Sequence, residues 1–124
     1  YRVVDLFLDT HPYNAGTTAS DALKMGLPML TMIGQSYQAR MGASILTSIN
    51  LPELITHTPK EYEALAIELA TNPEKLKAIK DKLASNLSTA PLFDTKRFTK
   101  NIESAYMQMY ERSQKGLEPD HIYV

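Results

Sequence analysis

The 124-residue sequence contains no cysteine, and its acidic and basic residues nearly balance. Without cysteine, neither a disulfide framework nor a thiolate metal site can form. The formal net charge is -1, with lysines and arginines scattered among acids, so no strong field draws the chain to nucleic acid or to an anionic membrane. No apolar run approaches the roughly 20 residues that cross a bilayer. These absences predict a cytoplasmic chain without nucleic-acid or membrane partners.

The first eight residues predict a buried parallel strand, because they are mostly apolar and β-branched or aromatic. Residues 28–32 are the only further strand candidate. Two parallel strands are not a stable sheet by themselves, so we expect this chain to be the C-terminal part of a larger α/β domain. The apolar edge of the first strand is then expected to be covered by another chain, or to let the fragment self-associate.

A helix is expected between these two strands. Gly16 belongs to the loop before it, the helix begins at Thr17 or Thr18, and Gly26 follows its end as a C′ residue. The resulting strand–helix–strand unit should have a right-handed crossover. After the second strand, a short loop leads into a helix over about residues 37–47.

The second half of the sequence is expected to be helical. The run Thr58-Pro59-Lys60-Glu61 is a capping box with proline at the first helical position, and Asn72-Pro73 starts the next helix in a similar way. A last helix should run from about Asp94 to Gly116. Its apolar stripe is expected to pack on a sheet or on another domain and consists of Phe98, Ile102, Ala105, Tyr106 and Met109.

The candidate ligand-binding residues are Gly16, Thr17, Thr18 and Asp21. In open parallel sheets, ligands bind beyond the carboxyl ends of the strands, where this loop leads into a helix. Glycine lets the backbone approach a ligand, and the threonines add hydroxyls to the free N–H groups of a helix start, which favour an anion such as a diphosphate. Asp21 could accept hydrogen bonds from a ribose. The alternative is structural, since threonines there are commonly N-caps and a first-turn acid favours the helix dipole.

The sequence gives little support for a metal site or for a nucleophilic catalytic site. His11, His57 and His121 are far apart in sequence, and no carboxylate lies at ligand spacing to them, so no metal site is expected. His11 could line the ligand cleft or be merely exposed, and Arg40 is interpreted as a surface charge. Neither a nucleophile elbow nor a P-loop motif is present. We therefore expect no catalytic residue and no cofactor in this chain.

A more specific signal comes from motifs that follow one another along the chain: Phe7-Leu8-Asp9-Thr10, Asn14, Thr17-Thr18 with Asp21, Gly26-Leu27-Pro28-Met29-Leu30-Thr31-Met32, Leu51-Pro52-Glu53-Leu54-Ile55, Pro91-Leu92-Phe93 and Pro119-Asp120-His121. Together they resemble the O-GlcNAc transferase/SPINDLY-type glycosyltransferases over nearly the whole chain. The resemblance implies a GT-B fold, in which two Rossmann-like halves enclose the donor. Residues 1–124 would be the C-terminal part of the nucleotide-sugar-binding half, with upstream strands and tetratricopeptide repeats missing.

The resemblance also implies roles for the loop residues. Thr17 and Thr18 match the pair that binds the donor diphosphate, and Asp21 matches the acid that holds the ribose. Gly16 departs from the animal members, which have histidine at this position. The implied activity of the parent protein is transfer of GlcNAc from UDP-GlcNAc to protein Ser/Thr hydroxyls with inversion of the anomeric centre, whereas the isolated chain is expected to be inactive.

Two alternatives stay open at this point. The same fold could use another donor, such as GDP-fucose or UDP-glucose, or the chain could be a non-catalytic scaffold with a vestigial donor loop. The threonine pair and Asp21 argue against the scaffold. The expected partners are a nucleotide-sugar donor and, for the full-length protein, a protein acceptor.

Overall fold

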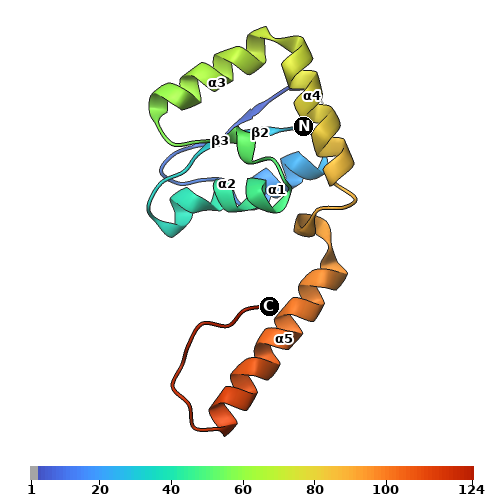
Figure 1. Cartoon of the computed structure of the whole chain (residues 1–124). Coiled ribbons are helices and arrows are strands. Elements are labelled where there is room, and N and C mark those ends of the chain that lie inside the picture. The colour runs from blue at the N-terminus through green and yellow to red at the C-terminus, as the bar shows by residue number, and fades with distance from the viewer. Residues whose placement is uncertain (1–2) are drawn as a thin grey trace. The chain divides into compact units, whose positions relative to one another are not determined.

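A three-stranded parallel sheet lies at the centre of the N-terminal unit of the chain, which ends at Leu92 (Figure 1). The computed structural model describes residues 3–124. In the sheet Phe7 pairs with Met29 and Thr31 pairs with Ile55, both in parallel register. The strands, in their order across the sheet, are β1 (Phe7–Leu8), β2 (Met29–Met32) and β3 (Ile55–Thr56).

The parallel pairing of the two expected strands is confirmed, but the extent of the first strand was wrong. Only Phe7 and Leu8 form β1, while Val3 and Val4 are 93% and 50% exposed. Residues 1 and 2, also part of the expected strand, lie outside the described residues. The reason is the position of β1 at the sheet edge: among the described residues it has one neighbour, β2, which is only four residues long. Backbone hydrogen bonds to one four-residue strand cannot hold eight residues in the β conformation.

The third strand, β3, was missed because it is only two residues long. It follows a 3-10 turn over Pro52–Leu54 and precedes the N-cap Thr58. Two residues show no period-2 alternation, so local pattern could not identify a strand there. Its hydrogen bonds with β2 widen the sheet to three strands.

Two helices pack on one side of the sheet and a third packs on the other side (Figure 1). The helix between β1 and β2 starts at Thr17 as expected, and Gly26 follows it with a positive φ of 79°, which glycine adopts without strain. Ser36 is the N-cap residue of the helix after β2, and its Oγ accepts a hydrogen bond from Ala39 N at 3.2 Å. The bounds are α1 (Thr17–Lys24), α2 (Tyr37–Ser48) and α3 (Pro59–Thr71).

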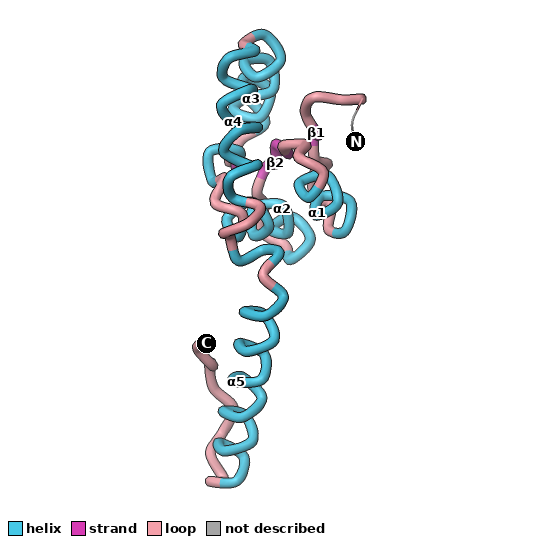
Figure 2. Tube along the Cα trace, turned by 90° about the vertical axis from the view of Figure 1, so that its right-hand side faces the viewer, coloured by secondary structure: helices cyan, strands magenta, loops and turns pink. Residues whose placement is uncertain are grey.

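The starts of the later helices agree with the sequence signals. Thr58 Oγ1 accepts a hydrogen bond from Glu61 N at 3.1 Å, while the Glu61 carboxylate accepts from the N–H of His57, one residue before the cap. Asn72 caps α4 (Pro73–Asn86), which lies beside α3 (Figure 2). Near the end of α4, Asn86 Nδ2 donates to the carbonyl of Ile49 at 2.8 Å and ties α4 to the end of α2. These caps are local in sequence, which is why they could be predicted.

The second unit spans Phe93–Val124 and consists of a long helix and a tail that returns along it. The helix, α5 (Thr95–Gln114), is capped by Asp94. Gln108 Nε2 donates to the carbonyl of Tyr123 at 3.2 Å and fixes the end of the tail to α5. Among the described residues no residue of α5 is fully buried, and the packing of its apolar stripe on a sheet or on another domain stays a prediction.

Candidate functional site

The predicted ligand loop lies at the carboxyl end of β1 and leads directly into α1. The loop after β2, residues 33–36, leaves the same edge of the sheet because the two strands are parallel. In open parallel sheets this edge is where ligands bind. The structure therefore brings Gly16, Thr17 and Thr18 to the position that the sequence predicted.

The N-terminus of α1 is open. Gly16 is the N-cap residue, so no side-chain oxygen caps the helix, and Thr17 and Thr18 are the first and second helical residues. The structural reading of these threonines as N-caps was therefore wrong. Both side chains are exposed, and among the described residues the N–H groups of Thr17 and Thr18 donate to no backbone or side-chain acceptor. Free N–H groups at a helix start are suited to an anion.

Asp21 is the fifth residue of α1 and is exposed. The expectation that it lies in the first turn was wrong, because the helix begins at Thr17 and its first turn contains no acidic residue. Residues three and four apart share one face of a helix, so Asp21 lies on the same side of α1 as Thr17 and Thr18. Its carboxylate forms no hydrogen bond or ion pair with the described residues.

The loop before α1 is held by the carboxylate of Asp9, which is buried at the end of β1. Its Oδ1 accepts hydrogen bonds from the N–H groups of Thr10 at 2.9 Å and Ala15 at 2.8 Å. Its Oδ2 accepts a hydrogen bond from Thr31 Oγ1 at 2.6 Å. One carboxylate therefore joins both ends of the loop and fastens them to β2.

Asn14 makes a second set of bonds inside the same loop. Its Nδ2 donates to the carbonyl of Thr10 at 2.8 Å, and its Oδ1 accepts from the N–H of Gly42, in α2, at 3.3 Å. A Cβ on Gly42 would lie 2.4 Å from Thr31 Oγ1 and 2.6 Å from Asp9 Oδ2. The glycine thus lets α2 approach the polar cluster closely.

Tyr62 reaches the loop from α3, on the opposite side of the sheet. Its hydroxyl donates to the backbone carbonyl of Asp9 at 2.8 Å. Burial, and to a smaller extent the nearby charge of Asp9, raises the pKa of the Tyr62 hydroxyl above its ordinary value. The neutral hydroxyl, which donates this bond, is therefore the form that the fold favours.

Tyr62→Phe should destabilise the protein by about 0.5–1.5 kcal/mol near neutral pH, because it deletes one hydrogen bond. The raised pKa means that the stabilising contribution is complete below the unfolded-state value of about 10. It is lost as the pH rises through the folded-state value, so the difference between wild type and variant should narrow above about pH 10. Urea unfolding of the full-length protein at pH 8 and at higher pH measures both effects. Tyr13→Phe is the control, since Tyr13 is 72% exposed, and an equal response of the two variants would contradict the prediction.

The remaining residues considered from sequence do not form one site. His11 is exposed, its ring lies against Gly34, and its Nδ1 is 3.4 Å from the carbonyl oxygen of Met32, so it bridges the loops after β1 and β2. His57 and His121 lie elsewhere, and residues 3–124 contain no group of three His, Asp or Glu side chains placed to hold a metal ion. No helix in this range is long and apolar enough to cross a membrane.

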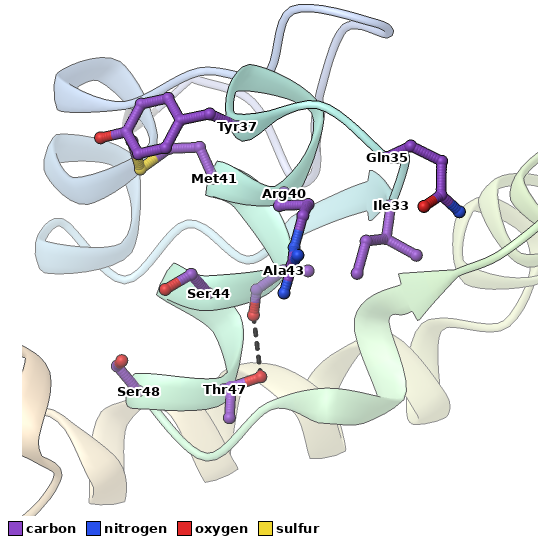
Figure 3. Close-up of a pocket in the computed structure, with 9 residues that line it drawn as sticks. All are labelled: Ile33, Gln35, Tyr37, Arg40, Met41, Ala43, Ser44, Thr47 and Ser48. Atoms are coloured by element: carbon purple, nitrogen blue, oxygen red, sulfur yellow. Dashed lines mark hydrogen bonds between the residues drawn. The ribbon is translucent and has the colours of Figure 1, made fainter. Parts of the chain in front are cut away.

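Arg40 is exposed, as expected, and lines a groove of about 740 Å³ along α2 (Figure 3). The side chains around it come from α2 and from the loop after β2, and include the hydroxyls of Ser44 and Ser48. None of Gly16, Thr17, Thr18 or Asp21 lines this groove. The groove is therefore lined by other residues than the candidate ligand site at the start of α1.

Sequence reasoning missed the residues beneath the loop. Asp9, Asn14 and Thr31 appeared only within the family motifs, Thr31 also within an expected strand. The available signal was a carboxylate directly after an apolar strand, which must find hydrogen-bond donors if it is buried. Its partners are up to 22 residues away in sequence, so no local pattern could identify them.

An exposed helix start with hydroxyls and a carboxylate on one face lies here at the carboxyl edge of a parallel sheet, which is the edge where α/β proteins bind their ligands. The model of glycosyl transferase family 41 matches residues 1–102, and the chain belongs to this family.

The relatives agree with this family. The chain is 36% identical over 119 residues to the probable UDP-N-acetylglucosamine–peptide N-acetylglucosaminyltransferase SPINDLY of Hordeum vulgare, covering 96% of this chain and 13% of that protein. It is 34% identical over 121 residues to the UDP-N-acetylglucosamine–peptide N-acetylglucosaminyltransferase of Caenorhabditis elegans, covering 98% of this chain and 10% of that protein. The chain thus spans about an eighth of the length of the relatives it matches.

A solved structure supports the same fold. A mutant O-GlcNAc transferase of Thermobaculum terrenum matches with a TM-score of 0.81 and 34% identity, over 86% of this chain and 21% of that one. The predicted resemblance and the predicted fold class, α/β as in a GT-B glycosyltransferase, are thereby confirmed.

Proposed function

We propose that the full-length protein is an inverting glycosyltransferase that moves GlcNAc from UDP-GlcNAc to a Ser or Thr hydroxyl of a protein. Residues 1–124 would form the C-terminal part of its nucleotide-sugar-binding half. Membership of family 41 and the names of the relatives support the reaction class and the donor. The observation that carries the role of this chain is the open N-terminus of α1 at the ligand edge of the sheet.

Gly16, Thr17 and Thr18 are assigned to the donor diphosphate. The free N–H groups of the two threonines and their exposed hydroxyls supply donors for phosphate oxygens. A Cβ added to Gly16 would meet no atom within 4 Å, so the space beside this residue is open to a ligand. Asp21, one turn further along the same face, is assigned to the ribose hydroxyls.

The proposed reaction gives these residues one chemical task. The acceptor hydroxyl oxygen attacks the anomeric carbon and gives up its proton to a base outside this chain, while the bond from that carbon to the diphosphate breaks and its electron pair leaves with UDP. Hydrogen-bond donors fixed at the departing diphosphate stabilise its charge as it develops. We assign no base for the acceptor proton in this chain, so the isolated chain is proposed to be inactive.

A donor panel tests the proposal. Purified full-length protein is incubated with an acceptor peptide mixture and labelled UDP-GlcNAc, UDP-glucose or GDP-fucose in parallel. Incorporation from UDP-GlcNAc is expected. The Thr17→Val, Thr18→Val double variant should reduce it at least tenfold, because the two hydroxyl groups that donate hydrogen bonds to the diphosphate are lost. If only GDP-fucose or only UDP-glucose supported incorporation, that nucleotide sugar would replace UDP-GlcNAc as the proposed sugar donor. No incorporation and no nucleotide binding would leave a scaffold as the better description.

A further inference from the structure

Three polar side chains in and beneath the loop that precedes α1 (residues 9–16) are almost completely buried: Asp9 is 6% exposed, Asn14 2% and Thr31 0%. Burial of a charged carboxylate is costly unless hydrogen bonds compensate for the lost water. Here the compensation is complete, because no buried side-chain nitrogen or oxygen atom of the described residues lacks a hydrogen-bond partner. Such a cluster specifies one conformation of the backbone that it holds.

The bonds of the cluster converge on the loop that precedes α1. Asp9 Oδ1 accepts from the N–H of Ala15, which is adjacent to Gly16. Asn14 holds the loop interior to Gly42 of α2, while Thr31 holds Asp9 from β2. The loop before α1 is thus fixed to the sheet and to α2 by three residues that are too deeply buried to contact a ligand bound outside.

We propose that Asp9, Asn14 and Thr31 are positioning residues of the donor site. They fix the direction in which the first-turn N–H groups of α1 point, and they do so without contacting the donor. This inference rests on the proposed function of the loop. Hydrogen-bond donors stabilise a charged ligand only when they are held close to the productive geometry. A shift of a binding group by about 1 Å can reduce catalysis about a hundredfold.

The test compares two buried threonines of the same strand pair. Thr31→Val removes the 2.6 Å bond to Asp9 at nearly constant volume. Thr56→Val is the matched control: Thr56 is 4% exposed, and its hydroxyl donates at 2.9 Å to the carbonyl of Thr31 but not to Asp9. Both variants lose one buried hydroxyl bond and should lower the melting temperature of the full-length protein, Thr31→Val more so because its bond is to a buried carboxylate.

Binding of UDP to the full-length proteins, measured by calorimetry, separates the two roles. We expect Thr31→Val to raise the Kd for UDP at least fivefold, Thr56→Val to change it less than twofold, and Thr31→Ser, which keeps the hydroxyl, to restore it. If Thr31→Val does not fold, Asn14→Ala serves instead, since it releases Thr10 and Gly42 but leaves Asp9 joined to Thr31.

Two results would overturn the inference, and they differ. Equal UDP affinities of the Thr31→Val and Thr56→Val variants, with wild-type protein binding UDP normally, would show that the cluster only stabilises the fold. The proposed function would survive that result. Failure of wild-type protein to bind UDP would overturn the proposed function itself and the positioning role with it.

Discussion

Asp9→Ala should destabilise the protein by about 3 kcal/mol or more. The substitution leaves three donors without their acceptor, namely the N–H groups of Thr10 and Ala15 and the hydroxyl of Thr31. The Thr31 hydroxyl is buried, and leaving a buried donor unsatisfied costs about 1–3 kcal/mol, to which the two part-buried N–H groups add. Urea unfolding of the full-length protein measures the loss, and hydrogen exchange at the Ala15 amide should become faster because this N–H loses its partner.

The control for Asp9→Ala is Asp5→Ala. Asp5 lies four residues earlier and pairs with Lys80 at 2.7 Å, but its side chain is 81% exposed. A surface ion pair of this kind contributes about 0–1 kcal/mol. If Asp9→Ala cost no more than Asp5→Ala, the buried carboxylate would not hold the loop. Asp9→Asn should fall between the two, since its amide oxygen still accepts hydrogen bonds while its NH₂ group cannot.

Asp21→Ala should weaken donor binding about tenfold or more in the full-length protein. If the carboxylate accepts bonds from two ribose hydroxyls, each charge-assisted bond is worth about 1.5–3 kcal/mol before water compensates, and about 1.4 kcal/mol is one decade in affinity. Asp21→Asn should be milder, because an amide oxygen can still accept one bond. Calorimetric titration with UDP measures the change.

The structure sharpens the Asp21 experiment. Asp21 is exposed, lies beyond the first turn of α1 and has no partner among the described residues, so its replacement should leave stability within about 0.5 kcal/mol of wild type. Glu63→Ala, at another exposed helical acid, controls for the loss of one surface charge. Unchanged UDP affinity in Asp21→Ala would remove Asp21 from the donor site.

How much the sequence could predict depends on the range of the interactions involved. The starts of α3 and α4 were predicted because the caps Thr58 and Asn72 each lie three residues from the N–H group that they accept from. The loop was placed correctly because a parallel strand pair fixes which edge it leaves. Local chemistry and one topological rule were sufficient for these features.

The features that sequence reasoning missed depend on distant residues. β3 is defined by its pairing with β2 and has no pattern of its own. The polar cluster joins Asp9 to Thr31, and Tyr62 donates to Asp9 across 53 positions.

At Gly16, the N-cap position of α1, a side chain that stabilised the helix would also obstruct a ligand. Neither packing nor backbone strain requires glycine at position 16, because a Cβ there would meet nothing within 4 Å and its φ is −103°. A serine or aspartate in its place could cap the helix and contribute about 0.5–2 kcal/mol. Its oxygen would then accept from the same N–H groups that are proposed to bind the donor phosphates. If the proposed donor binds here, its phosphate oxygens would act as the cap of α1, so donor binding would stabilise this helix.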